Sequence, residues 1–126
     1  MSGSLLGFIE KKQNPRDRLE VAYSTVHTFW RDYGDALQAE NGPFTFKHDL
    51  VQKMGQLHPH IAAVMDSLGS NQHSDSASVD KLQRKIQDIL HVQIMHMIQF
   101  ASRQDEFNRY LSALGLIHTI LERRGL

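Results

Sequence analysis

The sequence predicts an all-α protein: an antiparallel bundle of four to five helices that forms a dimer. Apolar residues recur at intervals of three and four over most of the chain, as one face of a helix requires, and the alternation typical of strands is almost absent. The 3 prolines and 8 glycines cluster between these periodic segments, where helices are expected to end. A chain of 126 residues has the size of a single domain, so we expect one bundle over residues 15–126.

The composition argues against several classes of protein. Apolar residues make up 40% and charged residues 22% of the chain, which is ordinary for a folded domain. The 14 basic residues are balanced by 14 acidic ones, whereas nucleic-acid-binding domains carry a basic excess. There is no cysteine, and no apolar run approaches the roughly 18 residues of a membrane span. The first residues also lack the pattern of a signal peptide, so we expect a cytoplasmic protein.

Residues 1–14 form an apolar N-terminal arm. Leu5, Leu6, Phe8 and Ile9 precede Glu10 and two lysines. We expect the arm to pack against its own bundle or a partner subunit. An alternative is contact with a membrane surface, in which the apolar residues enter the lipid and the lysines face the headgroups.

The first helix is expected over residues 15–40. Asn14 and Pro15 are favourable residues for a helix start, and Asn41, Gly42 and Pro43 are typical of a helix end. Between them runs one apolar stripe with spacings of three and four: Leu19, Ala22, Val26, Phe29, Tyr33 and Leu37.

Two shorter helices are expected next, over residues 44–57 and 59–68. Thr45 is a candidate N-cap, and Phe46, Leu50, Met54 and Leu57 supply the stripe of the first. The residue before a proline resists the α conformation, so we expect a break at His58–Pro59. Residues 69–78, GSNQHSDSAS, contain no large apolar side chain and are expected to form a flexible connector.

The next helix is expected over residues 79–101, and its second half predicts an interface. From Ile89 to Ala101 apolar residues face nearly every direction, and a helix that is apolar all round must be covered all round. Because one small bundle rarely encloses a helix completely, we predict that a second copy or a helical partner covers it. The residues predicted to form this interface are Ile89, Val92, Met95, His96, Met97 and Phe100.

The last helix is expected over residues 104–123. Its stripe keeps a three–four spacing with the preceding segment, so a single rod over residues 79–121 is an alternative. Helices of some forty residues are unusual, and Ser102 is a candidate N-cap, so two helices are favoured. His96 also suggests a hypothesis of its own: protonation of a histidine inside an interface would weaken the assembly.

The sequence contains no pattern that specifies chemistry. Phosphate-binding loops and nucleophile elbows are absent, and the adjacent pair Asp105–Glu106 is explained as dipole-favoured charge at a helix start. Eight histidines raise the question of a metal, but His91 and His96 are five residues apart, roughly 140° around a helix. We therefore expect no catalytic residues, no metal and no cofactor.

The function expected from these observations is non-catalytic: a protein-interaction or scaffolding domain that acts through self-association, as a homodimer, or through a helical partner. The alternative of a different class is a module that associates with membrane surfaces through residues 5–12. A metal- or cofactor-binding bundle, with haem as one case, is third.

Overall fold

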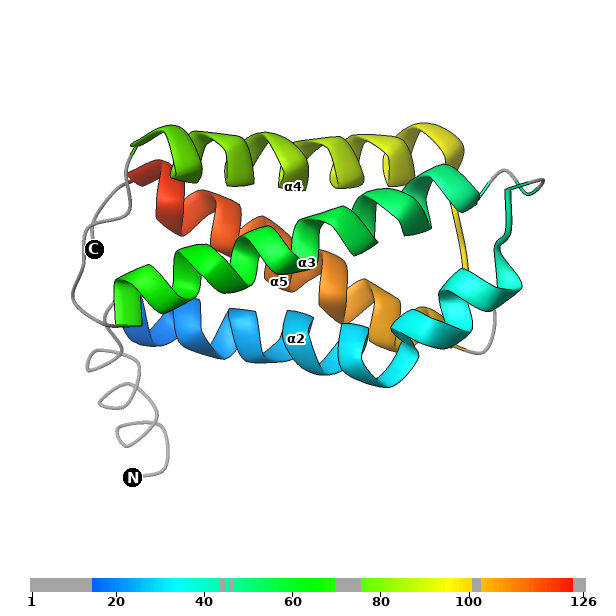
Figure 1. Cartoon of the computed structure of the whole chain (residues 1–126), viewed down its shortest axis with the longest axis horizontal. Coiled ribbons are helices and arrows are strands. Elements are labelled where there is room, and N and C mark those ends of the chain that lie inside the picture. Colours follow the sequence, from blue (N-terminus) through cyan, green and yellow to red (C-terminus); the bar gives the residue numbers. More distant parts are fainter. Residues whose placement is uncertain (1–14, 44, 46, 70–75, 101–102, 124–126) are drawn as a thin grey trace, which may run out of the picture.

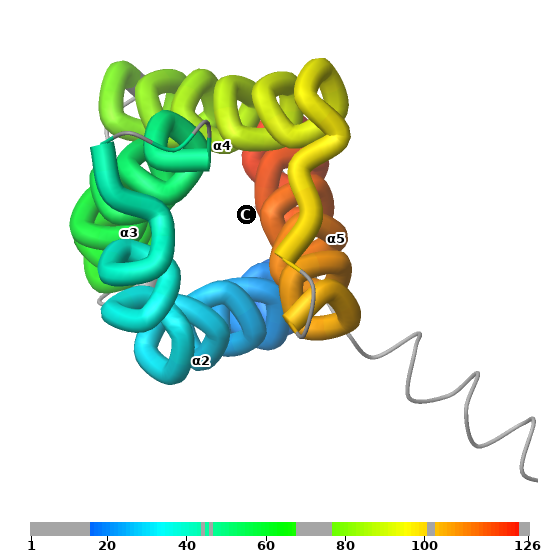
Figure 2. The backbone as a smooth tube through the Cα atoms, turned by 90° about the vertical axis from the view of Figure 1, so that its right-hand side faces the viewer, coloured from blue at the N-terminus to red at the C-terminus, as the bar shows by residue number. Residues whose placement is uncertain are grey.

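The computed structural model describes residues 15–43, 45, 47–69, 76–100 and 103–123. These residues form four helices and no strand: α2 (Pro15–Glu40), α3 (His48–Gly69), α4 (Ser76–His96) and α5 (Gln104–Arg123). Successive helices run in opposite directions along one long axis (Figure 1). Seen along that axis they stand at the corners of a square, and α5 closes against α2 (Figure 2). The predicted all-α bundle is confirmed, with four helices.

Helix α2 has the predicted bounds, and its stripe is buried. Leu19, Val26 and Leu37 are at most 1% exposed, because the three–four spacing places them all on the face that meets the other helices. At the C-terminal end, the Asn41 side chain donates a hydrogen bond from Nδ2 to the Leu37 carbonyl oxygen (2.9 Å). The Asn41 backbone amide donates to the same oxygen (3.0 Å), so this carbonyl at the end of the helix accepts two hydrogen bonds.

Helix α3 corrects the prediction of two helices and a break at Pro59. The helix runs without interruption from His48 to Gly69 and contains Pro59 in its interior. Pro59 is exposed, whereas Leu57 and Ile61 on either side of it are fully buried. Burial of the stripe on both sides therefore outweighs the loss of one backbone hydrogen bond, which proline cannot donate. Phe44 and Phe46 lie outside the described residues.

The segment from residue 79 to 121 forms two helices, as favoured, but the first is shifted. It begins at Ser76, three residues before the predicted start, and ends at His96 instead of residue 101. Helix α5 begins at Gln104 and ends at Arg123, as predicted. Gly69 lies in α3 and residues 76–78 lie in α4, so both ends of the predicted connector are helical; residues 70–75 lie outside the described residues.

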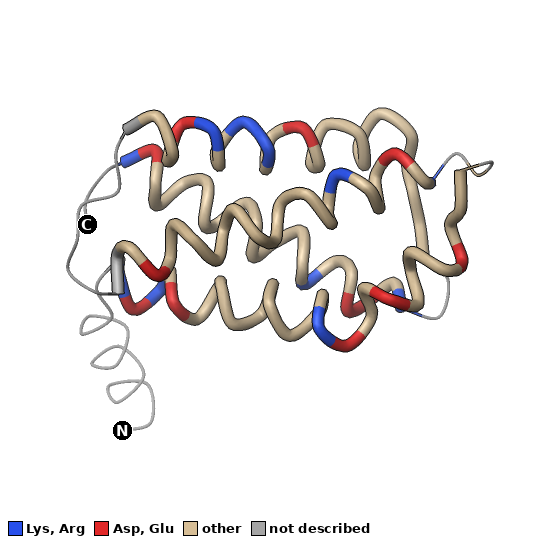
Figure 3. The backbone as a smooth tube through the Cα atoms, in the orientation of Figure 1, with Lys and Arg blue, Asp and Glu red and all other residues tan. Residues whose placement is uncertain are grey.

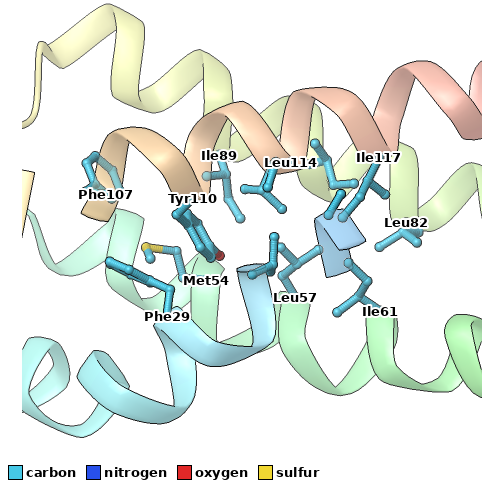
Figure 4. Packing of buried hydrophobic residues seen from close by; sticks show 14 of the residues in the cluster. Phe29, Met54, Leu57, Ile61, Leu82, Ile89, Phe107, Tyr110, Leu114 and Ile117 are labelled. Atoms are coloured by element: carbon cyan, nitrogen blue, oxygen red, sulfur yellow. The ribbon is translucent and has the colours of Figure 1, made fainter. Parts of the chain in front are cut away.

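The core lies along the axis of the square, and every helix contributes to it (Figure 4). Part of this core is aromatic. The ring centroids of Phe29 and Tyr110 are 4.7 Å apart, and those of Phe100 and Phe107 are 4.6 Å apart in an edge-on arrangement. Tyr110 and Phe107 are fully buried. This core fixes which side of each helix faces outward, including the exposed side of α4.

Candidate interaction surface

The C-terminal end of α4 exposes three large apolar side chains. Ile94 is 68% exposed, Met95 64% and Met97 77%. Only one other large apolar side chain of the described residues is comparably exposed: Val21, at 61%, which stands alone on α2. Single exposed apolar residues are ordinary on protein surfaces, but adjacent ones are characteristic of binding sites. We call Ile94, Met95 and Met97 the α4 tip.

A sharp change in chain direction after His96 creates the tip. Met97 has a φ of 48°, in the left-handed region, and the Ile98 amide donates to the Gln93 carbonyl oxygen (3.3 Å). This is a Schellman-type helix end, which most often has glycine at the left-handed position. The turn sends Ile98 and Phe100 inward, where they are 1% and 7% exposed, and leaves Met97 pointing into solvent.

The chain that follows the tip is fastened to the other helices. It crosses the end of the bundle from α4 towards α5 (Figure 2). The Lys47 ammonium donates a hydrogen bond to the Gln99 carbonyl oxygen and lies 5.2 Å from the centroid of Phe100. Arg103 pairs with Glu40 (3.2 Å) and lies 5.4 Å from the ring centroid of Tyr33. The tip is therefore presented by a segment that α2 and the turn before α3 support.

The outer face of α4 changes in character along its length. Lys81, Arg84, Asp88, His91 and Met95 are all exposed, and their spacings of three and four place them along one line of the helix. Asp88 lies 3.8 Å from Lys53 of α3. Within the part of the chain that the structure describes, Lys81 and Arg84 form no ion pair. The line therefore has basic residues at one end and an apolar residue at the other. Figure 3 shows that the charged residues of α4 are absent from its C-terminal end.

The interior holds a second notable group, a polar bridge across the core. His58 of α3 and Tyr110 of α5 stand on opposite corners of the square, and Nε2 of His58 lies 2.9 Å from the Tyr110 hydroxyl. Trp30 stacks on the imidazole, with ring centroids 4.9 Å apart and an interplanar angle of 5°. A Cβ at Gly34 would lie 2.9 Å from Cδ2 of Trp30, so the indole occupies space that only glycine leaves open.

Burial keeps both groups of this bridge neutral. It lowers the pKa of His58 to about 4, with a smaller contribution from the charge of His27, and it raises the pKa of Tyr110. A neutral imidazole and a neutral phenol can share one hydrogen bond in either direction. The bridge has its partners within the fold, so we assign it a structural role.

Two shallow hollows lie on the surface of the described residues. One, of about 360 Å³ between α2 and α5, is lined by hydroxyl groups and by charges of both signs, including Asp32, Glu106 and Arg109. The other, of about 270 Å³ between α4 and α5, includes Arg84, His118 and Glu122. Among the described residues, no three side chains of the metal-ligating types lie close enough to hold an ion. Neither hollow brings together the groups of a recognisable reaction.

The predicted interface residues separate into two groups. Met95, His96 and Met97 are exposed at the end of α4. Ile89 (Figure 4) and Phe100 are instead buried in the chain's own core. Val92 is partly buried against that core. The surface left for a partner is thus smaller than predicted, and Ile94, which the prediction omitted, belongs to it.

Leu5, Leu6, Phe8 and Ile9, which were predicted to contact a partner or a membrane, lie outside the described residues. The His58–Tyr110 bridge was not predicted from the sequence. A signal for it was present: His58 is next to Leu57 and three residues before Ile61, which places it at the edge of the buried stripe of α3.

Comparison with protein-family models, with curated proteins and with solved structures finds no similar protein. None of the described helices has the length and apolarity that crossing a membrane requires. A function for this chain is therefore inferred from its own geometry.

Proposed function

We propose that this chain is a non-catalytic protein-interaction domain and that the α4 tip is the site where a protein partner binds. The observation that carries the proposal is the adjacency of three large, mostly exposed apolar side chains on a bundle whose other described large apolar side chains, apart from Val21, are buried or partly buried. Surfaces of this kind are typical of binding sites in soluble domains. Methionine supplies two of the three, and its flexible, polarisable side chain adapts to a partner's shape.

The backbone at Met97 supports the same proposal. A non-glycine residue in the left-handed region is strained by about 1–2 kcal/mol. Glycine at this position would relieve the strain, and because the Met97 side chain is mostly exposed, its loss would forfeit little packing within the bundle. The stability of the fold therefore does not account for methionine here, whereas contact with a partner does.

The expected strength follows from the area that the tip can bury. Complete burial of an aliphatic side chain of this size is worth about 1.5–3 kcal/mol, so the three largely exposed residues together contribute roughly 3–6 kcal/mol. Association itself costs at least about 4 kcal/mol. Stable binding thus needs contacts beyond the tip, and we expect a weak or transient complex if the tip acts alone.

The homodimer predicted from the sequence is one form of this function. Light scattering over a range of protein concentrations tests it: a mass that rises towards two chains, and that falls back in Met95→Glu, is the expected result for self-association. A mass of one chain at every concentration would contradict the dimer and leave a different protein as the partner. The cytoplasmic location, favoured by the absence of cysteine, remains an expectation as well.

A displayed library of helical peptides, selected on the wild-type chain, tests the proposal directly. The selected peptides should bind Ile94→Glu and Met97→Glu at least about tenfold more weakly, since loss of one buried aliphatic contact exceeds roughly 1.4 kcal/mol. Val21→Glu is the matched control, because it places the same charge on an equally exposed apolar residue of α2. Peptides that bind all three variants like the wild type, or no selected peptides, would overturn the proposal.

A further inference from the structure

We propose that the partner of the α4 tip is an acidic amphipathic helix, which lies along the outer face of α4 with its apolar end on the tip and its acidic end over Lys81 and Arg84. This inference rests on the proposed function and adds the chemistry of the partner to it. The line Lys81, Arg84, Asp88, His91 and Met95 is the surface concerned.

The spacing along this line fits a single helix of ordinary length. Lys81 and Met95 are fourteen residues apart in one straight helix, which is about 21 Å at roughly 1.5 Å per residue. A partner helix of four to five turns covers that distance. Packed against α4, it would present residues at three–four spacing to a line that has the same spacing.

The charges along the line select an acidic partner. Lys81 and Arg84 are exposed and form no ion pair with other described residues. Asp88, the acidic residue of the line, lies within ion-pair distance of Lys53, which offsets its charge. A carboxylate-bearing segment would therefore find two available cations at one end of α4, and Arg84 offers a guanidinium that can bind a carboxylate through two donors.

A second copy of the chain fits this line less well. If two α4 helices paired antiparallel around a two-fold axis at Asp88, the two Asp88 side chains would face each other. The apolar Met95 would then face Lys81 of the second copy. Both juxtapositions are unfavourable, one through repulsion and the other through the loss of hydration at a charge.

An anionic membrane is the other surface that attracts basic and apolar groups together, but the arrangement on α4 does not suit one. Helices that lie on membranes carry their apolar residues along the whole length of one face, with basic residues beside them. On α4 the two kinds of residue are separated lengthwise by about 15–20 Å. Insertion of the tip into lipid would hold Lys81 and Arg84 away from the headgroups.

The peptide library extends to a test of this inference, with peptides of about 18 residues, or roughly 27 Å of helix. The selected peptides should carry aspartate or glutamate about three to four turns from their apolar residues. They should bind Arg84→Glu about three- to tenfold more weakly than wild type, and raising the salt concentration should weaken binding to the wild type. Arg18→Glu, the same change at an exposed arginine of α2, should bind like the wild type.

The outcomes distinguish the inference from the proposed function. Peptides that need the tip but lack acidic residues and bind Arg84→Glu normally would overturn the inference and leave the proposed function standing. If no peptide depends on the tip, both fail. Flotation with phosphatidylcholine vesicles that contain phosphatidylserine gives the remaining comparison: binding that is lost in both Met95→Glu and Arg84→Glu would assign the surface to membranes and overturn the inference.

Discussion

The His58–Tyr110 bridge and the α4 tip depart from the usual distribution of polar and apolar groups in opposite ways. The bridge places polar groups inside the bundle and supplies each with a partner: a hydrogen bond between them and an indole stacked on the imidazole. The tip places apolar groups outside, where the described chain leaves each of them mostly exposed. The first departure is complete within one chain, whereas under the proposed function the second is completed by another molecule. This difference is why we assign stability to the bridge and function to the tip.

The largest effect that separates the two regions is expected from truncation to alanine. Tyr110→Ala should lower the free energy of unfolding by about 3–5 kcal/mol, because it opens a cavity in the core and leaves His58 without its partner. Met95→Ala should change it by less than about 0.5 kcal/mol, since the side chain is mostly in solvent. Urea unfolding followed by circular dichroism measures both. Equal losses would mean that the tip contributes to the fold after all.

The second effect is a dependence of stability on pH that belongs to the bridge. The pKa of His58 is about 4 in the folded chain and near 6.5 when unfolded, so the unfolded chain binds the proton more readily. Stability is therefore complete above pH 6.5 and falls as the pH is lowered from 6.5 to 4, by at most about 3 kcal/mol. Urea unfolding across this range measures the loss.

Two variants assign that pH dependence to one histidine. His58→Gln should flatten the part of the curve between pH 6.5 and 4, because its side chain does not titrate there. His91→Gln, which removes an exposed histidine of α4, should leave the curve unchanged. If the two variants behave alike, the decline arises elsewhere in the molecule.

The third effect is the loss of one hydrogen bond without loss of the ring. Tyr110→Phe keeps the aromatic packing but leaves the His58 nitrogen without its partner, so stability should fall by about 1–2 kcal/mol. Adding His58→Phe to this variant removes the unsatisfied group and should recover part of the loss. If the double variant is less stable than the sum of the two single changes predicts, the result would contradict the hydrogen bond between His58 and Tyr110.

The smallest effect has the opposite sign and concerns the tip. Met97→Gly relieves a left-handed backbone and should raise the free energy of unfolding by about 0.5–1 kcal/mol. Thermal and urea unfolding measure the gain. Met97→Ala is the control, because it shortens the side chain and keeps the strain. A destabilised glycine variant would show that the Met97 side chain supports the fold.

The sequence predicted those features that local periodicity determines. The stripe from Leu19 to Leu37 gave the bounds and inward face of α2, and the pattern after Phe107 did the same for α5. It failed at Pro59, where local preference favoured a break but burial of Leu57 and Ile61 on both sides kept the helix intact. That balance depends on tertiary packing, which the sequence does not display.

The error at the candidate site had a related cause. The apolar run from Ile89 to Ala101 was assigned to one helix, so all of its faces had to be covered. In the structure the helix ends at His96, with Met97 rather than a glycine at the left-handed position that follows, and the chain then turns Ile98 and Phe100 into the core. If helical periodicity is assumed beyond His96, Ile98 and Phe100 are assigned to the wrong side of the helix. The structure leaves Met95 and Met97 exposed at the end of α4, and their role in an interface stays a prediction.

The most direct test of the central claim is the affinity of one tip-selected peptide for the wild type and for Met97→Gly, measured by isothermal titration calorimetry. The account predicts that the glycine variant binds at least several-fold more weakly although it is the more stable protein, so that unfolding cannot explain the loss. Equal affinity for the two proteins would contradict the assignment of the α4 tip as the partner-binding surface.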